Sequence, residues 1–398
     1  MKNRMLFLTT LNLASNPRLV KEIRLALHLK KQVTVICFRF NNWSAEINDK
    51  LLSEFQSVRF IQIDGEKSSY FSWLTSAISE WINRKLSKWI SLPLFMHAVA
   101  ISRRSQLLVD ALKKVSAADW VVGHNPGAIY ATYKASQKFK CKSGFDVEDY
   151  HPGEGNDKHL QNITLSLMKK IFPKFNYVSF ASQSILNESE KNIGSFLIQK
   201  SIVINNCFPE NEFIEPAAIN DKRLRVVWFS QHIDKSRGLE QIIPIVHKHS
   251  DKIVLTLFGN CNESFKQKYI DRQNGIELGG ILPQLELHQR LSTFDIGLAI
   301  EPGKDLNNEL ALSNKVYAYL QAGLFIIATD TIEQHRFLEK LSDAGIIVNK
   351  KFSNIEDIFI QLNANIENLR NEKLNRFAKA RSYSWQPLSL QLTNLWVS

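Results

Sequence analysis

The sequence predicts an α/β protein made of two Rossmann-like, doubly wound domains that face each other across a cleft. Apolar runs of strand length alternate with helical patterns along the chain, as in parallel sheets covered by helices on both faces. A polar stretch at 204–223, with two prolines and a charge cluster, interrupts this alternation and predicts a linker. The first domain is therefore expected to span 1–207, and the second 208–385.

Thirteen short apolar runs are predicted to be strands. Those of the first domain are 5–11, 32–38, 58–63, 120–123, 144–147, 177–180 and 202–204, and those of the second are 225–229, 253–258, 276–278, 296–300, 325–328 and 346–348. Helical patterns lie between most of them, for example at 18–30, 238–248, 263–273, 285–294 and 333–341. Helix dominates 354–380, and the last residues, 386–398, are expected to form a helix that packs back on the first domain.

The net charge of +11 is unevenly distributed along the chain. Residues 1–200 carry 28 Lys and Arg against 16 Asp and Glu, whereas residues 201–398 carry 22 against 23. The first half is therefore expected to meet an anionic partner, with a merely basic surface as the alternative. The four cysteines are widely spaced and indicate neither a zinc site nor a disulfide framework, which is typical of a reducing cytosol.

One predicted helix begins with a charge in an unfavourable place. It starts after Ser313 and ends at Gly323, and Lys315 lies in its first turn, where the helix dipole is already positive. A bound anion would turn this repulsion into attraction. Arg237 begins another helix after a strand in the same way. The two cations predict a site for the pyrophosphate of a nucleotide-sugar, with solvated surface charges as the alternative.

Further residues after the strands complete the predicted donor site. Glu301 and Glu309 offer carboxylates for sugar hydroxyls, and Gly259 ends a strand and would let a ligand approach the backbone. The predicted donor-binding set is Arg237, Gly259, Glu301, Glu309, Ser313, Asn314 and Lys315.

The second half resembles the donor-binding domain of GT-B glycosyltransferases, in particular retaining glycosyltransferase family 4. The resemblance rests on "RGLE" at 237–240 and on "SNKVYAYLQAGLF" at 313–325, where the family has a P-N-K-x-x-E-Y-x-x-x-G-x-P element. It implies that Arg237 and Lys315 bind the donor pyrophosphate. The chain departs from the pattern at Ala318, where the family usually has a Glu that holds the donor ribose, and at Ser313 and Phe325, which replace two prolines.

The resemblance extends into the first half through "SNPRLVKEIRLALHLKKQVTVI", "ADWVVGHNPGAIYATYKA" and "FDVEDYHPGE". Related enzymes often keep a His beside the reacting sugar where this chain has His124. The opening loop, "NLASNP", replaces a glycine-rich loop and offers side chains instead. We expect catalytic acid–base groups among His124, Asp149 and Glu154, and acceptor contacts from Asn12, Ser15, Asn16, Arg18 and His151.

The segment 68–104 combines aromatic and basic residues at helical spacing. Its members are Tyr70, Phe71, Trp73, Trp81 and Trp89 with Arg84, Lys85, Lys88, Arg103 and Arg104. Such a pattern is typical of an interfacial helix on an anionic membrane. An insertion packed on the domain's own core is the alternative. No apolar run is long enough to span a bilayer, so a cytoplasmic protein, peripheral at the inner face of the membrane, is expected.

Together these observations predict a retaining, hexosyltransferase-type glycosyltransferase. It would transfer a sugar from a nucleotide-sugar to a lipid-linked saccharide acceptor in cell-surface polysaccharide biosynthesis. The alternatives are a GT-B-shaped sugar-nucleotide epimerase, which would turn over without acceptor, and a non-catalytic membrane- or polyanion-binding protein. No cofactor is expected, the resemblance implies no metal, and the absence of an RNP motif argues against nucleic acid.

Overall fold

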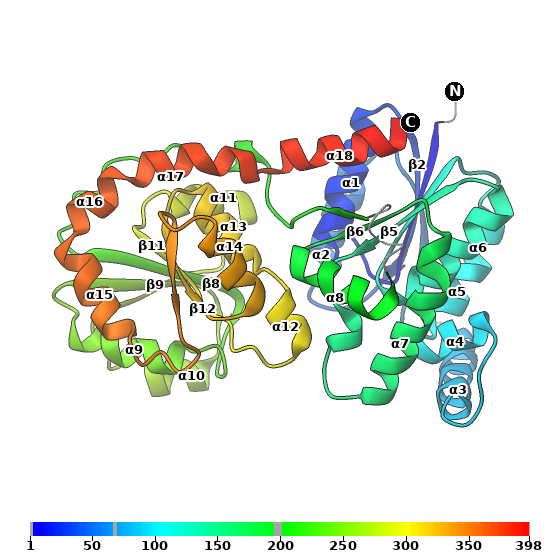
Figure 1. Cartoon of the computed structure of the whole chain (residues 1–398), viewed down its shortest axis with the longest axis horizontal. Helices are drawn as coiled ribbons and strands as arrows, with labels where there is room; N and C mark the ends of the chain where they lie inside the picture. The colour runs from blue at the N-terminus through cyan, green and yellow to red at the C-terminus, as the bar shows by residue number, and fades with distance from the viewer. Residues whose placement is uncertain (1–2, 67–69, 195–200, 398) are drawn as a thin grey trace. The chain divides into compact units, whose positions relative to one another are not determined.

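The computed structural model describes residues 3–66, 70–194 and 201–397, and the chain divides into two compact units (Figure 1). Unit 1 comprises Met1–Asn205 and Gln391–Ser398, and unit 2 comprises Asn206–Leu390. This division lies two residues before the expected boundary at 207. The C-terminal segment that belongs to unit 1 begins at Gln391, five residues after the expected start at 386.

Unit 1 is built on a parallel seven-stranded sheet with the order β3-β2-β1-β4-β5-β6-β7. Its strands are β1 (Arg4–Thr9), β2 (Gln32–Arg39), β3 (Arg59–Asp64), β4 (Trp120–His124), β5 (Lys142–Val147), β6 (Tyr177–Phe180) and β7 (Ser201–Val203). The register places Thr9, His124, Asp146 and Ser179 in one row across four strands. This row lies at the carboxyl edge of the sheet, where doubly wound folds bind their ligands.

Helices follow most strands of unit 1. They are α1 (Pro17–His28), α2 (Ala45–Glu54), α3 (Tyr70–Leu86), α4 (Leu94–Ile101), α5 (Arg104–Ala111), α6 (Ile129–Phe139), α7 (Lys158–Ile171) and α8 (Gln183–Ile193). Aromatic rings fill the core between the sheet and these helices, for example Phe145 stacked on Phe175 with 5.8 Å between ring centroids. The last helix, α18 (Trp385–Val397), ends in unit 1, where the buried indole of Trp396 donates a hydrogen bond to the Tyr177 hydroxyl at 3.0 Å.

Unit 2 contains a parallel six-stranded sheet with the order β10-β9-β8-β11-β12-β13. Its strands are β8 (Leu224–Ile233), β9 (Ile253–Cys261), β10 (Ile276–Gly280), β11 (Ile296–Ala299), β12 (Phe325–Thr329) and β13 (Gly345–Val348). Its helices are α9 (Leu239–Lys248), α10 (Glu263–Tyr269), α11 (Gln284–Leu291), α12 (Leu306–Leu310), α13 (Asn314–Gln321), α14 (Ile332–Glu339), α15 (Ile355–Ala364), α16 (Ile366–Asn371) and α17 (Lys373–Ala380). Two buried apolar clusters, centred on Trp228 and Tyr319, form its core.

The predicted α/β class with parallel sheets is confirmed, and each of the thirteen predicted strands is present. The largest difference lies in β8 and β9. They continue to Ile233 and Cys261, where a register shift precedes the pairing of His232 with Asn260. The continuous apolar pattern stops at Phe229, so it does not reveal the extension, although Ile233 at its end is buried in the core.

Candidate active site

Three of the predicted donor-binding residues, Arg237, Ser313 and Lys315, act on the carboxylate of Glu301, which follows β11. The ammonium of Lys315 lies 2.8 Å from Glu301 Oε1, and the hydroxyl of Ser313 donates a hydrogen bond to the same oxygen at 2.9 Å. Burial alone would raise the pKa of Glu301. Lys315, Ser313 and the charge of Arg237 outweigh this effect and hold its pKa below the ordinary value. Glu301 is therefore ionised, and two cations share its surroundings.

The N-terminus of α13 has available backbone donors. Ser313 occupies the N-cap position, as expected, but its hydroxyl is directed to Glu301 and does not cap the helix. The N–H of Val316 donates to the carbonyl oxygen of Ser313 at 3.0 Å, and the N-cap side chain takes up none of the first-turn N–H groups. The ring of Trp228 lies 5.7 Å from the Lys315 ammonium and supports it from one side. First-turn N–H groups beside a lysine form an arrangement that binds anions.

Arg237 lies in a tight turn before α9. Gly238, the N-cap residue, has a φ of 84°, and a Cβ there would lie 2.9 Å from the ring of Phe352. Only glycine fits this left-handed position without strain. The turn allows the half-buried Arg237 to exert its charge on Glu301, so the predicted Arg237–Lys315 pair shares one electrostatic neighbourhood.

The surroundings of three other predicted donor residues can be described without a ligand. Glu309 forms an ion pair with Lys350, and Asn314 is exposed at the first position of α13. Gly259 has a φ of 139°, and a Cβ there would lie 2.1 Å from the carbonyl oxygen of Ser230. The close approach that requires this glycine is therefore made by the neighbouring strand β8. Close approach of a ligand is not needed to explain it.

In unit 1, the row at the carboxyl edge of the sheet contains a buried network of charges. The guanidinium of Arg18 donates to Asp146 Oδ2 at 2.7 Å and to the carbonyl oxygen of Ile204 at 2.7 Å. The hydroxyl of Ser179 donates to Asp146 Oδ1 at 2.7 Å. Both partners of the Arg18–Asp146 pair are almost fully buried, so each depends on the other for compensation of its charge.

His124 lies within this network. Its Nε2 is 3.2 Å from Glu22 Oε2, and its Nδ1 is 3.5 Å from Asp146 Oδ2. Burial alone would lower the pKa of His124, but the two carboxylates raise it to about 9. The imidazole is 2% exposed, and both of its ring nitrogens face protein carboxylates. This geometry does not support the prediction that His124 acts directly as a base, and instead indicates a charged group that stabilises the sheet edge.

Glu22, His124 and Asp146 could in principle hold a metal ion, because their ligand atoms lie within 4.8 Å of one another. However, Arg18 already places a positive charge on Asp146 at hydrogen-bond distance. A divalent cation would have to displace this charge and the proton of His124. The donor set therefore fits an internal ion-pair network better than a metal site.

The loop before α1 is held by its own side chains. Asn12 donates to the Ser44 hydroxyl at 2.6 Å and accepts from the backbone N–H of Ser15 at 3.0 Å. Asn16 caps α1 by accepting from the N–H of Leu19 at 3.1 Å. Asn12, Asn16 and Arg18 are buried, so the structure corrects the expectation that they reach the acceptor. Ser15, which is half-buried, is the predicted member of this loop with accessible surface.

His151 and Glu154 form a dyad beside a cavity. His151 Nδ1 lies 3.0 Å from Glu154 Oε2, while the buried Nε2 has no hydrogen-bond partner among the described residues. Burial alone would lower the pKa of His151, but Glu154, with Asp149 and Glu148, raises it. Both members of the dyad line a cavity of about 190 Å³ whose wall includes Thr10, Pro126, Gln161 and Thr164. A histidine oriented by a carboxylate, with its second nitrogen unpaired, has the geometry of an acid–base group.

Two residues near these sites, Glu22 and Asn125, were not predicted from the sequence, and Glu148 was given no role of its own. Glu22 lies on α1, far along the chain from His124. The sequence around it has the pattern of an ordinary helix, so nothing marks Glu22 as a site residue. Asn125 has a φ of 70° directly after β4, which is rare for a residue other than glycine and is a feature often found at functional sites. Glu148 belongs to the motif "FDVEDYHPGE", and burial raises its pKa to about 7, an effect that the charge of Arg18 only partly offsets.

Comparisons with known proteins agree with this architecture. No family model matches the chain. A relative in Klebsiella pneumoniae, described as an uncharacterized 42.6 kDa protein in the cps region, is 23% identical over 235 residues. The match covers 56% of this chain and 62% of that relative, which is less than two thirds of its length.

Solved structures are similar over almost their full length. HepE of Anabaena in complex with UDP matches with a TM-score of 0.67 and 12% identity over 99% of each chain. The same protein in complex with UDP-glucose matches with a TM-score of 0.65 and 12% identity, also over 99% of each chain. Sucrose-phosphate synthase of Thermosynechococcus elongatus matches with a TM-score of 0.67 and 10% identity. The match covers 99% of this chain and 98% of that one. The chain therefore has the GT-B fold, as its sequence motifs predict.

Proposed function

We propose that this protein is a glycosyltransferase that transfers a sugar from a nucleotide-sugar to a hydroxyl of a saccharide acceptor. The observation that carries the proposal is the cluster of Lys315, Arg237 and Glu301 at the N-terminus of α13. It lies in a fold shared with HepE, which has been solved with UDP and UDP-glucose.

Unit 2 would bind the donor. The two cations and the first N–H groups of α13 suit the two negative charges of a pyrophosphate, and Glu301 suits a sugar or ribose hydroxyl. Ala318 is fully buried in α13, so it cannot replace the ribose-binding Glu of the family. The arrangement therefore supports phosphate recognition more strongly than recognition of one nucleoside.

Unit 1 would activate the acceptor through the His151–Glu154 dyad. In the transfer, an oxygen of the acceptor forms a bond to the anomeric carbon, and the bond from that carbon to the donor phosphate breaks. The nucleoside diphosphate leaves with the electron pair, and the proton of the acceptor hydroxyl passes to Nε2 of His151. In the retaining route that the family resemblance implies, a donor phosphate oxygen can take this proton instead.

Donor binding and transfer are tested together. We expect UDP to stabilise the protein in a thermal-shift assay, and UDP-glucose to be consumed faster when saccharide acceptors are present, because binding to the native state alone raises the apparent stability. Turnover of a nucleotide-sugar without any acceptor would favour an epimerase. Lack of stabilisation by every nucleoside diphosphate would overturn the proposal.

The dyad predicts a dependence of activity on pH. His151 must be neutral to accept a proton, so kcat/KM should rise with pH through its raised pKa. In Glu154→Gln the pKa of His151 falls, because the carboxylate that raises it is gone and burial still lowers it. The acidic limb of the profile should therefore move to lower pH. Glu46→Gln, in an exposed ion pair on α2, is the control and should leave the profile unchanged. An unmoved profile in Glu154→Gln would remove the dyad from proton transfer.

The finer parts of the proposal concern the acceptor and the membrane. We include a lipid-linked acceptor, cell-surface polysaccharide assembly, retention at the anomeric carbon, independence of metals and association with the inner membrane face. Within the described residues, no helix combines the length and the apolar character needed to cross a membrane. Support for surface association comes from the part of 68–104 that the structure describes, residues 70–104, where large apolar side chains are exposed. The coupling constant of the anomeric proton in the product tests retention.

A further inference from the structure

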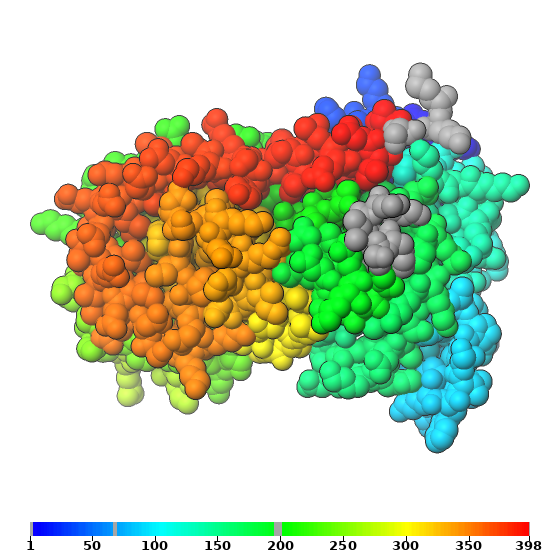
Figure 2. Space-filling view, viewed as in Figure 1, coloured from blue at the N-terminus to red at the C-terminus, as the bar shows by residue number. Residues whose placement is uncertain are grey.

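The helix α3 exposes apolar residues and buries polar ones, the reverse of an ordinary surface helix. Its buried residues are Ser76 and Asn83. The large exposed apolar side chains of α3 and the turn after it are Tyr70, Phe71, Ile78, Trp81, Ile82, Leu86, Trp89 and Ile90. Helices that pack on a core show the opposite pattern, so this one is expected to have an apolar partner outside the chain. Figure 2 shows α3, in blue to cyan, projecting at the edge of unit 1.

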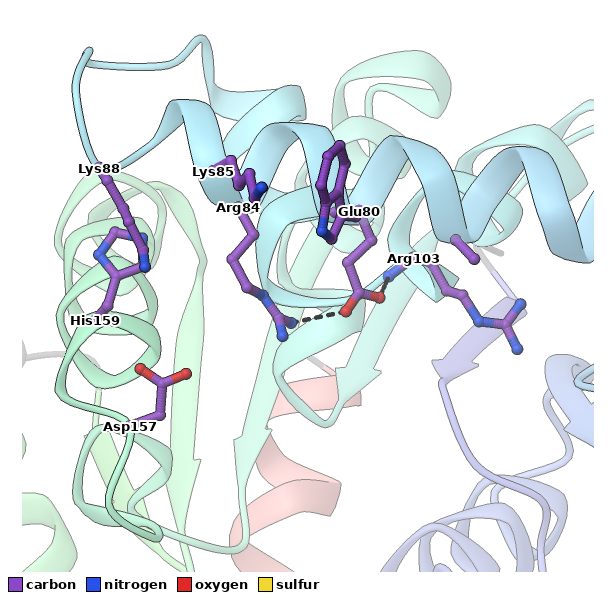
Figure 3. A pocket seen from close by; sticks show the side chains of 9 residues that line it. Glu80, Arg84, Lys85, Lys88, Arg103, Asp157 and His159 are labelled. Carbon is purple, nitrogen blue, oxygen red and sulfur yellow. Dashed lines mark hydrogen bonds and ion pairs between the residues drawn. The ribbon is translucent and has the colours of Figure 1, made fainter.

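A basic pocket lies directly beside this apolar surface. It has a volume of about 360 Å³ and is bounded by α3 and the start of α7 (Figure 3). Four basic and two acidic side chains line it, giving a net charge of +2 when His159 is neutral. His159 enters from α7, where its Nε2 lies 2.9 Å from the hydroxyl of Ser87.

The acidic residues of the pocket are already engaged. Glu80 forms an ion pair with Arg84 at 2.7 Å and accepts from the backbone N–H of Arg103 at 2.8 Å. Asp157 caps α7 by accepting from the N–H of Leu160 at 3.0 Å. These carboxylates hold the walls of the pocket in place and leave its other cations to be neutralised from outside.

Lys85 and Lys88 are the cations available for this role. Neither forms an ion pair within the described part of the chain, and both are exposed. The ammonium of Lys85 lies 4.1 Å from the centroid of the Trp81 ring, which holds it beside the apolar surface of α3. An anion in this pocket would therefore be bound next to the exposed apolar side chains of α3.

We propose that this pocket binds the phosphate ester of an anionic lipid headgroup, with Lys85 and Lys88 as its ligands and the exposed face of α3 inserted among the acyl chains. The inference rests on the membrane association proposed above and assigns it a specific site. A phosphate diester carries one negative charge and a monoester up to two, which the net charge of the pocket can compensate. The apolar residues around the pocket favour a lipid over free phosphate.

The test compares two double variants of the full chain. Lys85→Ala/Lys88→Ala removes the proposed ligands. Lys169→Ala/Lys170→Ala removes the same charge from exposed positions at the far end of α7, about 16 Å along the helix from the pocket residue His159. Co-sedimentation is measured with vesicles of phosphatidylcholine alone and with vesicles in which phosphatidylglycerol replaces one third of it. We expect the wild type to bind the anionic vesicles and the pocket variant to bind them about 30-fold more weakly, since each basic residue near an anionic surface contributes roughly a factor of five.

The control variant should lose less than about threefold, because its lysines lie outside the pocket. Equal losses of vesicle binding in the two variants would overturn the pocket as a binding site and leave only general attraction between basic residues and the anionic surface. A wild type that binds neither kind of vesicle would overturn membrane association itself. Inorganic phosphate serves as a second probe. If it stabilises the wild type but not the pocket variant while vesicle binding is unchanged, the site binds free phosphate and the lipid assignment is wrong. UDP binding, measured on the same variants, reports separately on the donor site in unit 2.

Discussion

Replacing Arg18 by alanine is expected to lower the stability of unit 1 by about 3–5 kcal/mol, because it leaves the buried carboxylate of Asp146 without its charge partner. The guanidinium also donates a hydrogen bond to the carbonyl oxygen of Ile204, near the point where the chain leaves unit 1. The substitution removes this hydrogen bond as well. Urea unfolding followed by tryptophan fluorescence measures the change, and the transition of unit 2 serves as an internal reference.

Arg24→Ala is the matched control for this substitution. Arg24 lies on the same helix, α1, and pairs with Glu54 at 2.8 Å, but both side chains are about half exposed. Water screens such a pair, so the loss should stay below about 1 kcal/mol. Arg18→Lys keeps the charge but loses the bidentate geometry of the guanidinium. Its loss of stability should lie between those of Arg18→Ala and Arg24→Ala. Equal losses at Arg18 and Arg24 would show that the buried network does not stabilise unit 1.

Replacing Lys315 by alanine is expected to weaken the binding of UDP about 10- to 100-fold, as measured by titration calorimetry. The variant loses a hydrogen-bond donor with a full positive charge. It also leaves the carboxylate of Glu301, 2.8 Å away in the native protein, without its ion-pair partner beside the phosphates. Repulsion from Glu301 should add to the loss, so Lys315→Ala/Glu301→Gln should bind UDP more tightly than Lys315→Ala.

Lys252→Ala is the control for the donor site. Lys252 is exposed immediately before β9, at the amino end of the sheet, whereas Lys315 and Glu301 follow the carboxyl ends of the strands. The control should bind UDP as the wild type does. Unchanged affinity in Lys315→Ala would remove this lysine from the donor site, and an equal loss in Lys252→Ala would indicate a general effect of charge.

Much of the fold could be predicted from short-range patterns. All thirteen strands were recognised as short apolar runs, and this signal is clearest for central strands such as β4 and β11, which are buried along their whole length. The position of Lys315 at the start of a helix was also visible, since capping and glycine signals mark the ends of α13. The polar extensions of β8 and β9 gave no such signal.

The sites were less predictable, because residue type indicates chemistry but not partners. Asn16 in the opening loop and Arg18 at the start of the following helix were expected to face a ligand, whereas both side chains are buried in the structure. His124 was expected to act on a substrate, and the structure surrounds it with the carboxylates of Glu22 and Asp146. The contacts of Arg18 with Asp146 and of His124 with Glu22 join residues more than a hundred positions apart.

The sequence by itself determined the two α/β units, the order of their strands along the chain and the two cations at helix starts, because these depend on periodicity and on neighbouring residues. Only the tertiary structure decided which charges are paired inside the protein and which remain available to a ligand. That distinction depends on burial and on partners brought together by the fold. Thus the charge of Arg18 is neutralised by Asp146 inside the protein. Lys85 and Lys88, which are also basic residues, remain exposed beside an apolar helix face.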